Sequence, residues 1–222
     1  LHHPDSIRKG RQQEVMKNTI VKDAAILFVI TLIAGLALGA VHAITLEPIN
    51  QATIAATNKT YSEVYPEASE FENTDELTAA VEQANTEIDT WGIGNKAGKL
   101  SINDAMVAKD ASGNAVGYMI IATSGEGYGG DIKMTVGVSN DGKVTGIGFL
   151  TINETVGLGL KAKNPEFKDQ FVGKDASGSI EGVKTGNAND QQFNAISGAT
   201  FTSTAVSYAL NAALHFVNNC IQ

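Results

Sequence analysis

Small hydroxyl residues gather ahead of an apolar C-terminal segment in the run SGATFTST, residues 197–204. The run contains no acid, base or metal ligand, so any chemistry there must come from hydroxyl groups and backbone amides. From Ser203 to Asn219 apolar residues recur at helical spacing, which predicts an amphipathic helix with Thr202 or Ser203 as its N-cap. The free N–H groups and dipole of its first turn favour a nearby anion. The run therefore predicts either an ordinary capping loop or a place where a hydroxyl is esterified to a phosphate.

Two glycine clusters are the other candidate site segments, GEGYGG at 125–130 and GLG at 157–159. Glycine permits unusual backbone angles and close approach of a ligand. The clusters predict either tight turns alone or, together with residues 197–200, a shallow cradle for a planar ring.

The segments that must position these loops have the pattern of an α+β domain. Residues 132–138 alternate apolar and polar side chains, the pattern of a strand with one buried face, and Asn140-Asp141-Gly142 is typical of a hairpin turn. We expect further strands at Met106–Lys109, Ala115–Thr123 and Lys143–Leu150, and helices at 73–88 and 165–172. The predicted fold is a single N-terminal transmembrane helix followed by a small antiparallel-sheet domain with flanking helices.

The membrane segment is predicted from the uncharged stretch 24–46, which is long enough to cross a bilayer. Five cations precede it, and the first cation after it is Lys59, so the N-terminus is expected in the cytoplasm and the rest outside. Two alternatives are a signal peptide cleaved near Val41-His42-Ala43 and a buried core helix.

The expected layout follows from this segment. Residues 1–22 form a cytoplasmic tail, 23–46 the transmembrane helix, 47–72 a stalk helix and linker, and 73–222 the extracytoplasmic domain. Translation is expected to start at Met16, because residues 1–15 have no apolar period; intact mass would test this.

Composition excludes several kinds of site. The formal net charge of −8 and sequence pI near 5.0 argue against a nucleic-acid surface. The single cysteine, Cys220, cannot form an internal disulfide or by itself build a zinc or iron–sulfur centre, and the four histidines lack metal-ligand spacing. We expect no metal site.

Together, the N-terminal membrane segment, ETVGLG at 154–159 and SGAT at 197–200 resemble the FMN-binding domain family. The likeness extends to the branch that includes the G subunits of Rnf ion-translocating ferredoxin:NAD oxidoreductase complexes. The family elements ETPGLG with its following lysine, G-Y-x-G and F-x-G-K match Glu154, Thr155, Gly157, Leu158, Gly159 and Lys161, then Gly127, Tyr128 and Gly130, then Phe171, Gly173 and Lys174. Two positions depart from the family: Val156 replaces a proline, and Asn194 replaces an aspartate.

The resemblance implies a covalent flavin. In that family FMN is joined through its phosphate to the last threonine of the motif, which is Thr200 here, by a separate flavin transferase. The implied neighbours of the tether are Ser197, Gly198, Ala199, Thr202 and Ser203. The implied neighbours of the ring are Tyr128, Glu154, Thr155, Gly157, Leu158, Gly159 and Lys161.

The implied function is electron transfer, without bond chemistry on a substrate, among the iron–sulfur and flavin subunits of a membrane complex. The C subunit of a sodium-translocating NADH:quinone reductase, or a stand-alone flavin carrier, is the alternative within the same family. A membrane-anchored assembly module without a cofactor is the alternative from another class.

Overall fold

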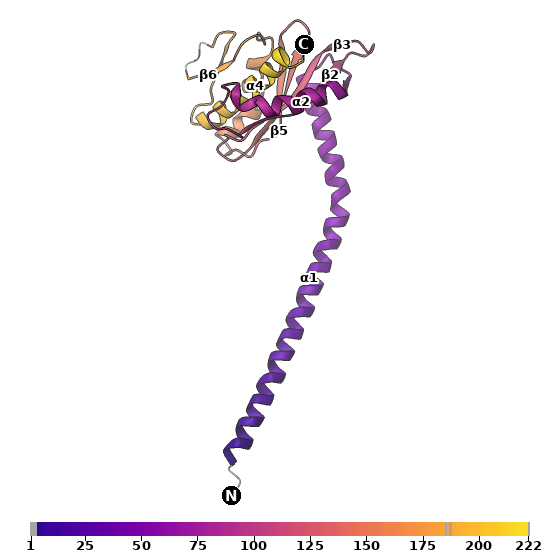
Figure 1. The fold of residues 1–222 in the computed structure, drawn as a ribbon, viewed down its shortest axis with the longest axis vertical. Helices are drawn as coiled ribbons and strands as arrows, with labels where there is room; N and C mark the ends of the chain where they lie inside the picture. Colours follow the sequence, from indigo (N-terminus) through magenta and orange to yellow (C-terminus); the bar gives the residue numbers. More distant parts are fainter. Residues whose placement is uncertain (1–3, 185, 187, 222) are drawn as a thin grey trace. The chain divides into compact units, whose positions relative to one another are not determined.

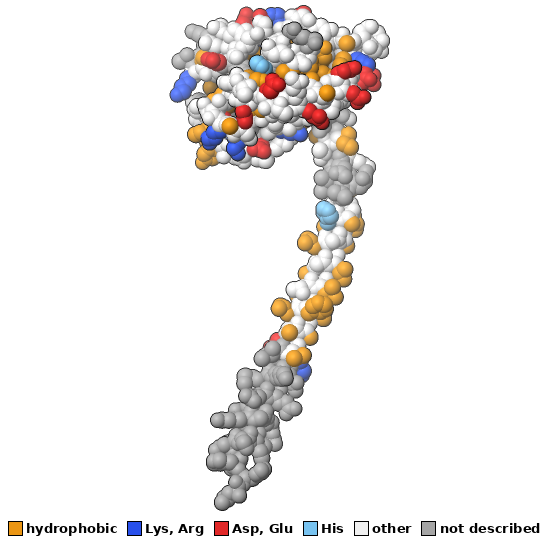
Figure 2. Space-filling view, viewed as in Figure 1, with side chains coloured by type: hydrophobic (Ala, Val, Ile, Leu, Met, Phe, Trp, Pro, Cys, Tyr) orange, Lys and Arg blue, Asp and Glu red, His pale blue; other side chains and the backbone are white. Residues whose placement is uncertain are grey.

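The computed structural model describes residues 4–184, 186 and 188–221, and the chain divides into two units, Leu1–Ala55 and Ala56–Gln222. Helix α1 (Pro4–Val64) occupies most of the first unit and continues into the second. In the described part of the chain, one helical stretch, Val21–Thr45, is long and apolar enough to cross a membrane. None of this stretch is buried, which argues against the core-helix alternative. Figure 2 shows the hydrophobic side chains that cover it.

The threonines of the apolar stretch satisfy their own hydroxyls within the helix. Thr31 Oγ1 donates to the Leu27 carbonyl at 3.0 Å, and Thr45 Oγ1 donates to the Val41 carbonyl at 2.8 Å. Such bonds keep polar atoms paired where no water is available. The stalk helix expected within residues 47–72 is the continuation of α1, which ends at Val64.

The second unit is built on an antiparallel sheet in the order β1-β2-β3-β4-β5 (Figure 1). The strands are β1 (Glu70–Glu72), β2 (Leu100–Lys109), β3 (Ala115–Ser124), β4 (Ile132–Ser139) and β5 (Val144–Thr151). The predicted hairpin turn joins β4 to β5, with Gly142 at φ +73°. A small parallel pair, β6 (Glu181–Val183) and β7 (Gln192–Asn194), lies outside this sheet. The α+β prediction is confirmed.

Helices α2 (Asp75–Glu87) and α4 (Thr200–Asn219) pack on one face of the sheet (Figure 1). Ile120 on β3 pairs with Val136 on β4, and both are fully buried in a core shared with Leu210 of α4. Thr74 caps α2, since its Oγ1 accepts a hydrogen bond from the Leu77 amide at 3.2 Å.

Short helical segments complete the fold: η1 (Ile88–Thr90), η2 (Gly159–Lys163), α3 (Pro165–Lys168) and η3 (Asp169–Phe171). The single helix expected at 165–172 is therefore a turn of α-helix followed by a 3-10 turn.

The opposite face of the sheet receives the last turns of α1 in a groove lined by glycines. Gly137, Gly146 and Gly148 lie side by side on β4 and β5, where Val64 is 1 % exposed. A β-carbon at Gly146 would lie 2.9 Å from the Val64 carbonyl oxygen, and one at Gly148 would lie 2.8 Å from Val64 Cγ2. Larger side chains would therefore exclude the helix end.

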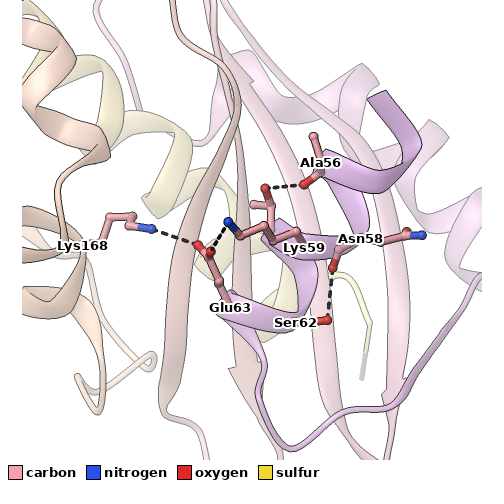
Figure 3. A network of polar contacts seen from close by, with 7 residues as sticks. Ala56, Asn58, Lys59, Ser62, Glu63 and Lys168 are labelled. Atoms are coloured by element: carbon pink, nitrogen blue, oxygen red, sulfur yellow. Dashed lines mark hydrogen bonds and ion pairs between the residues drawn. The ribbon is translucent and has the colours of Figure 1, made fainter. Parts of the chain in front are cut away.

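Polar contacts fasten the same helix end. Thr145 Oγ1 donates to the Val64 carbonyl at 2.8 Å, and the Tyr65 hydroxyl donates to the Val116 carbonyl at 2.6 Å. Figure 3 shows Glu63 between Lys59 of α1 and Lys168 of α3, at 3.9 and 3.2 Å. The last turns of α1 are thus an integral part of the second unit.

Candidate functional site

The SGAT segment forms the start of α4, which begins at Thr200 with Ala199 as its N-cap. The prediction that Thr202 or Ser203 caps the helix is wrong. Gly198 adopts φ +79°, which reverses the chain and lets the helix begin earlier. The Ser203 hydroxyl accepts a hydrogen bond from the Ile196 amide at 2.9 Å and donates to the Ala199 carbonyl at 3.1 Å. It therefore fastens the preceding turn from inside the helix.

The first turn of α4 presents free backbone donors. The amides of Thr200, Phe201 and Thr202 have no acceptor within the helix, because no helical carbonyl lies four residues earlier. Their N–H groups and the helix dipole favour a negative charge at this end. The Thr200 side chain is exposed, whereas Thr202 is buried. Of the two, Thr200 presents a hydroxyl that a reagent from solution can reach.

A cavity of about 480 Å³ opens beside Thr200. Most of the residues singled out in the sequence line it together. The lining residues come from the loop after β3, the segment after β5 and the start of α4, and they are Tyr128, Glu154, Thr155, Leu158, Gly159, Gly198, Ala199, Thr200, Phe201 and Thr202. Loops far apart in the sequence thus meet at one site.

Glu154 links two of these loops. Its side chain is only 8 % exposed, and its Oε1 accepts hydrogen bonds from the amides of Tyr128 at 2.9 Å and Gly129 at 3.3 Å. A β-carbon at Gly127 would lie 2.8 Å from the same Oε1, and one at Gly159 would lie 2.8 Å from Oε2. Both glycines are therefore needed for the carboxylate to fit. The sequence indicated Glu154 as a ring neighbour; the structure also gives it a role in joining the loops.

Leu158 brings the two motifs together. Gly157 at φ +80° turns the chain, and the amides of Leu158 and Leu160 donate to the Thr155 carbonyl at 3.1 and 3.2 Å. A β-carbon at Gly198 would lie 3.4 Å from Leu158 Cδ2. The ETVGLG loop therefore lies in van der Waals contact range of the SGAT turn.

Four predicted residues are absent from the lining of this cavity. Gly157 turns the ETVGLG loop through its φ of +80° but does not line the cavity. Lys161 is exposed and shares a neighbouring hollow of about 260 Å³ with Ser197. Ser197 and Ser203 also line a third cavity of about 610 Å³, which Thr200 borders as well. Thr200 thus stands between two cavities.

Asn194, one of the two departures from the family pattern, lies in the hollow beside Lys161. The backbone amide of Asn194 donates to Gln170 Oε1 at 2.7 Å. Its side-chain Oδ1 is buried and has no hydrogen-bond partner among the described residues.

Phe201 is the site residue that the sequence reasoning missed. It lines the cavity, is exposed, and its ring centroid lies 6.4 Å from that of Tyr128. Its position directly after Thr200, in the first turn of a helix, was the available signal.

The residues present fit a phosphate-tethered flavin. The volume of about 480 Å³ falls within the range of about 300–1,000 Å³ typical of small-molecule sites. The cavity combines apolar walls with an exposed hydroxyl and unpaired amides at a helix start, and its glycines allow close approach. In the described part of the chain no cluster of His, Cys, Asp or Glu could hold a metal ion.

The part of the chain that forms the cavity matches a known family of domains. Residues 127–215, which contain every residue of the cavity, match the FMN-binding domain family. The chain is 32 % identical to the G subunit of the Na(+)-translocating ferredoxin:NAD(+) oxidoreductase complex of Acetobacterium woodii, over 90 % of this chain and 92 % of that protein. It is also 32 % identical to the G subunit of the proton-translocating ferredoxin:NAD(+) oxidoreductase complex of Clostridium ljungdahlii, over 63 % of this chain and 76 % of that protein.

The chain therefore belongs to the family of G subunits of ion-translocating ferredoxin:NAD(+) oxidoreductase complexes. The resemblance stated from the sequence motifs is confirmed. Among solved structures, NqrC of Shewanella oneidensis gives a TM-score of 0.46 at 18 % identity, over 70 % of this chain and 72 % of that chain.

Proposed function

We propose that this chain is a membrane-anchored electron carrier of an ion-translocating ferredoxin:NAD(+) oxidoreductase complex, with FMN held covalently on Thr200. The observation that carries the proposal is the position of Thr200: an exposed hydroxyl on the first turn of α4, at the edge of a cavity built by the family's own motifs. FMN, when bound, supplies reversible electron transfer, and the protein fixes its position and surroundings.

Attachment is a phosphoryl transfer that a separate flavin transferase performs with FAD. The Thr200 oxygen forms a bond to the phosphorus of the FMN half, and the bond from that phosphorus to the AMP half breaks. AMP leaves, and the hydroxyl proton is released. The product is a phosphodiester with one negative charge, which the free amides of residues 200–202 stabilise.

The remaining residues hold the flavin without reacting. Gly198 and Ala199 leave clearance beside the tether, and Ser203 keeps the turn before the helix closed. Thr155, Leu158 and Gly159 form one wall of the ring site, and Tyr128 forms another.

Four further predicted site residues act around the ring site and the tether. Glu154 keeps the two walls in register through its hydrogen bonds to the amides at 128 and 129. Thr202 is buried in the first turn of α4, next to Gly159, and also lines the cavity. Lys161 and Ser197, in the neighbouring hollow, place one positive charge and one hydroxyl near the tether.

The membrane arrangement follows from charge. Five cations precede the apolar stretch and none follows before Lys59, so the N-terminus lies in the cytoplasm and residues 47–222 lie outside. A covalent bond retains the flavin there, where a dissociable cofactor would be diluted away. Its partners are the other subunits of the complex, which deliver and remove electrons through iron–sulfur and flavin centres.

In-gel fluorescence tests the proposal. The full-length chain is expressed with a flavin transferase as wild type, Thr200→Ala and Thr200→Ser, and the denaturing gel is viewed under ultraviolet light. We expect a fluorescent wild-type band, a dark alanine band, and a serine band that retains signal because the hydroxyl remains. A dark wild-type band favours the cofactor-free assembly module, whereas a bright alanine band refutes the attachment site.

A further inference from the structure

Exposed apolar side chains gather at the cavity. Of the residues that line it, Tyr128 is 75 % exposed, Phe201 67 % and Leu158 44 %, and Val156, in the same loop as Leu158, is 81 % exposed. Among the described residues of the second unit, the one other large hydrophobic with comparable exposure is Val172. Apolar side chains concentrated around one opening mark a surface that something else covers.

Two of these side chains form a preorganised aromatic wall. The rings of Tyr128 and Phe201 are 6.4 Å apart with 43° between their planes, near the outer limit of direct aromatic packing. They line both the 480 Å³ cavity and a smaller hollow of about 330 Å³, so they stand between the two. The backbone of Tyr128 is held by Glu154, and the backbone of Phe201 lies in the first turn of α4.

The position of Phe201 connects this wall to the tether. It follows Thr200 directly, and both line the same cavity, which Leu158, in contact range of Gly198, also lines. A flat aromatic group attached at Thr200 would enter between an aliphatic side chain and an aromatic pair. Aromatic faces pack favourably on planar rings, so such a group would cover side chains that are otherwise exposed.

We propose that Phe201, with Tyr128, packs against the isoalloxazine ring of FMN carried on Thr200, and that Phe201 is a positioning residue for that ring. This inference rests on the proposed function and adds to it a residue that the family motif does not specify. The apolar wall excludes water from one side of the ring. Because an apolar surrounding disfavours the extra negative charge of a reduced ring, removal of the wall shifts the flavin's midpoint potential upward.

The test uses the full-length chain, loaded by co-expression with a flavin transferase and purified in detergent. The variants are Phe201→Ala, Phe201→Tyr as the control that keeps the aromatic face, and Tyr128→Leu as a second probe of the wall. The denaturing gel first measures attachment, which all variants should retain because Thr200 is intact. Iodide quenching and anisotropy of flavin fluorescence then measure ring exposure and mobility in the folded protein.

We expect Phe201→Ala to raise the iodide quenching constant about 2- to 10-fold, the range to which aromatic packing energies correspond, and to lower the anisotropy. Phe201→Tyr should match the wild type, and Tyr128→Leu should change in the same direction as Phe201→Ala. The midpoint potential of Phe201→Ala should be more positive than that of the wild type.

Several results would overturn the inference. A loaded Phe201→Ala protein with wild-type quenching and anisotropy would show that the ring lies elsewhere, and would leave the exposed apolar side chains as a contact for another protein of the complex. A dark Phe201→Ala band beside a bright wild type would give Phe201 a role in attachment instead. A dark wild-type band would refute the proposed function, and this inference with it.

Discussion

Replacing Glu154 tests whether this carboxylate joins the site loops or merely lies near the flavin. In Glu154→Ala, the amides of Tyr128 and Gly129 lose their acceptor in a setting where the side chain was 8 % exposed. Both amides belong to exposed residues, so water replaces part of the lost acceptor and the two together cost about 1–3 kcal/mol. At about 2–4 °C per kcal/mol for a domain of this size, the expected fall in Tm is about 2–12 °C.

The matched control is Glu154→Gln, which keeps an oxygen acceptor and loses only the charge, at a cost of about 1 kcal/mol. The assay is thermal unfolding of the flavin-free, full-length chain in detergent, followed by the fluorescence of Trp91, the single tryptophan. Trp91 lies in the second unit, so its signal reports that unit. If the alanine and glutamine variants unfold at the same temperature, the amide contacts do not hold the loops together.

Three further predictions follow from the packing of the second unit. Gly148→Val should destabilise it by about 1–3 kcal/mol, because its side chain would meet Thr60 of α1, and a melt equal to the wild type would contradict the glycine groove. Burial, aided by nearby acidic groups, raises the pKa of Tyr65 to about 12, above its unfolded value of about 10. Stability should therefore fall as pH rises from 10 to 12, and Tyr65→Phe should reduce that fall in denaturant titrations; an unchanged dependence of stability on pH would count against the role of Tyr65. Gly159→Ala should reduce in-gel flavin fluorescence several-fold, since its β-carbon would meet Thr202, and full loading would exclude that crowding.

The regular part of the fold was predictable because local signals agreed with it. Alternation over 132–138 and the Asn140-Asp141-Gly142 turn predicted β4 and its hairpin, and the helical pattern over 73–88 predicted α2. The first half of β2 was missed because Ser101, Asn103 and Asp104 interrupt the apolar pattern there, where the register also shifts between Ile102 and Asp104. Strand β1, with its two glutamates, has no buried apolar face to reveal it.

The site was predictable as a set of loops but not in its detail. Glycine-rich segments and the hydroxyl run indicated where a ligand could approach, and most of them line one cavity. The helix start was misplaced because Ser203 bonds the Ile196 amide, a partner that lies outside the helix and depends on the turn at Gly198. Phe201 was missed because its exposure is a tertiary property that sequence spacing does not express.

The covalent attachment of FMN to Thr200 can be tested by the mass of the peptide spanning residues 185–222, from chain produced with a flavin transferase. We expect a peptide heavier by FMN less one water, with fragment ions that assign the added mass to Thr200. An unmodified peptide, or an addition on Ser197, Thr202 or Ser203, would contradict it.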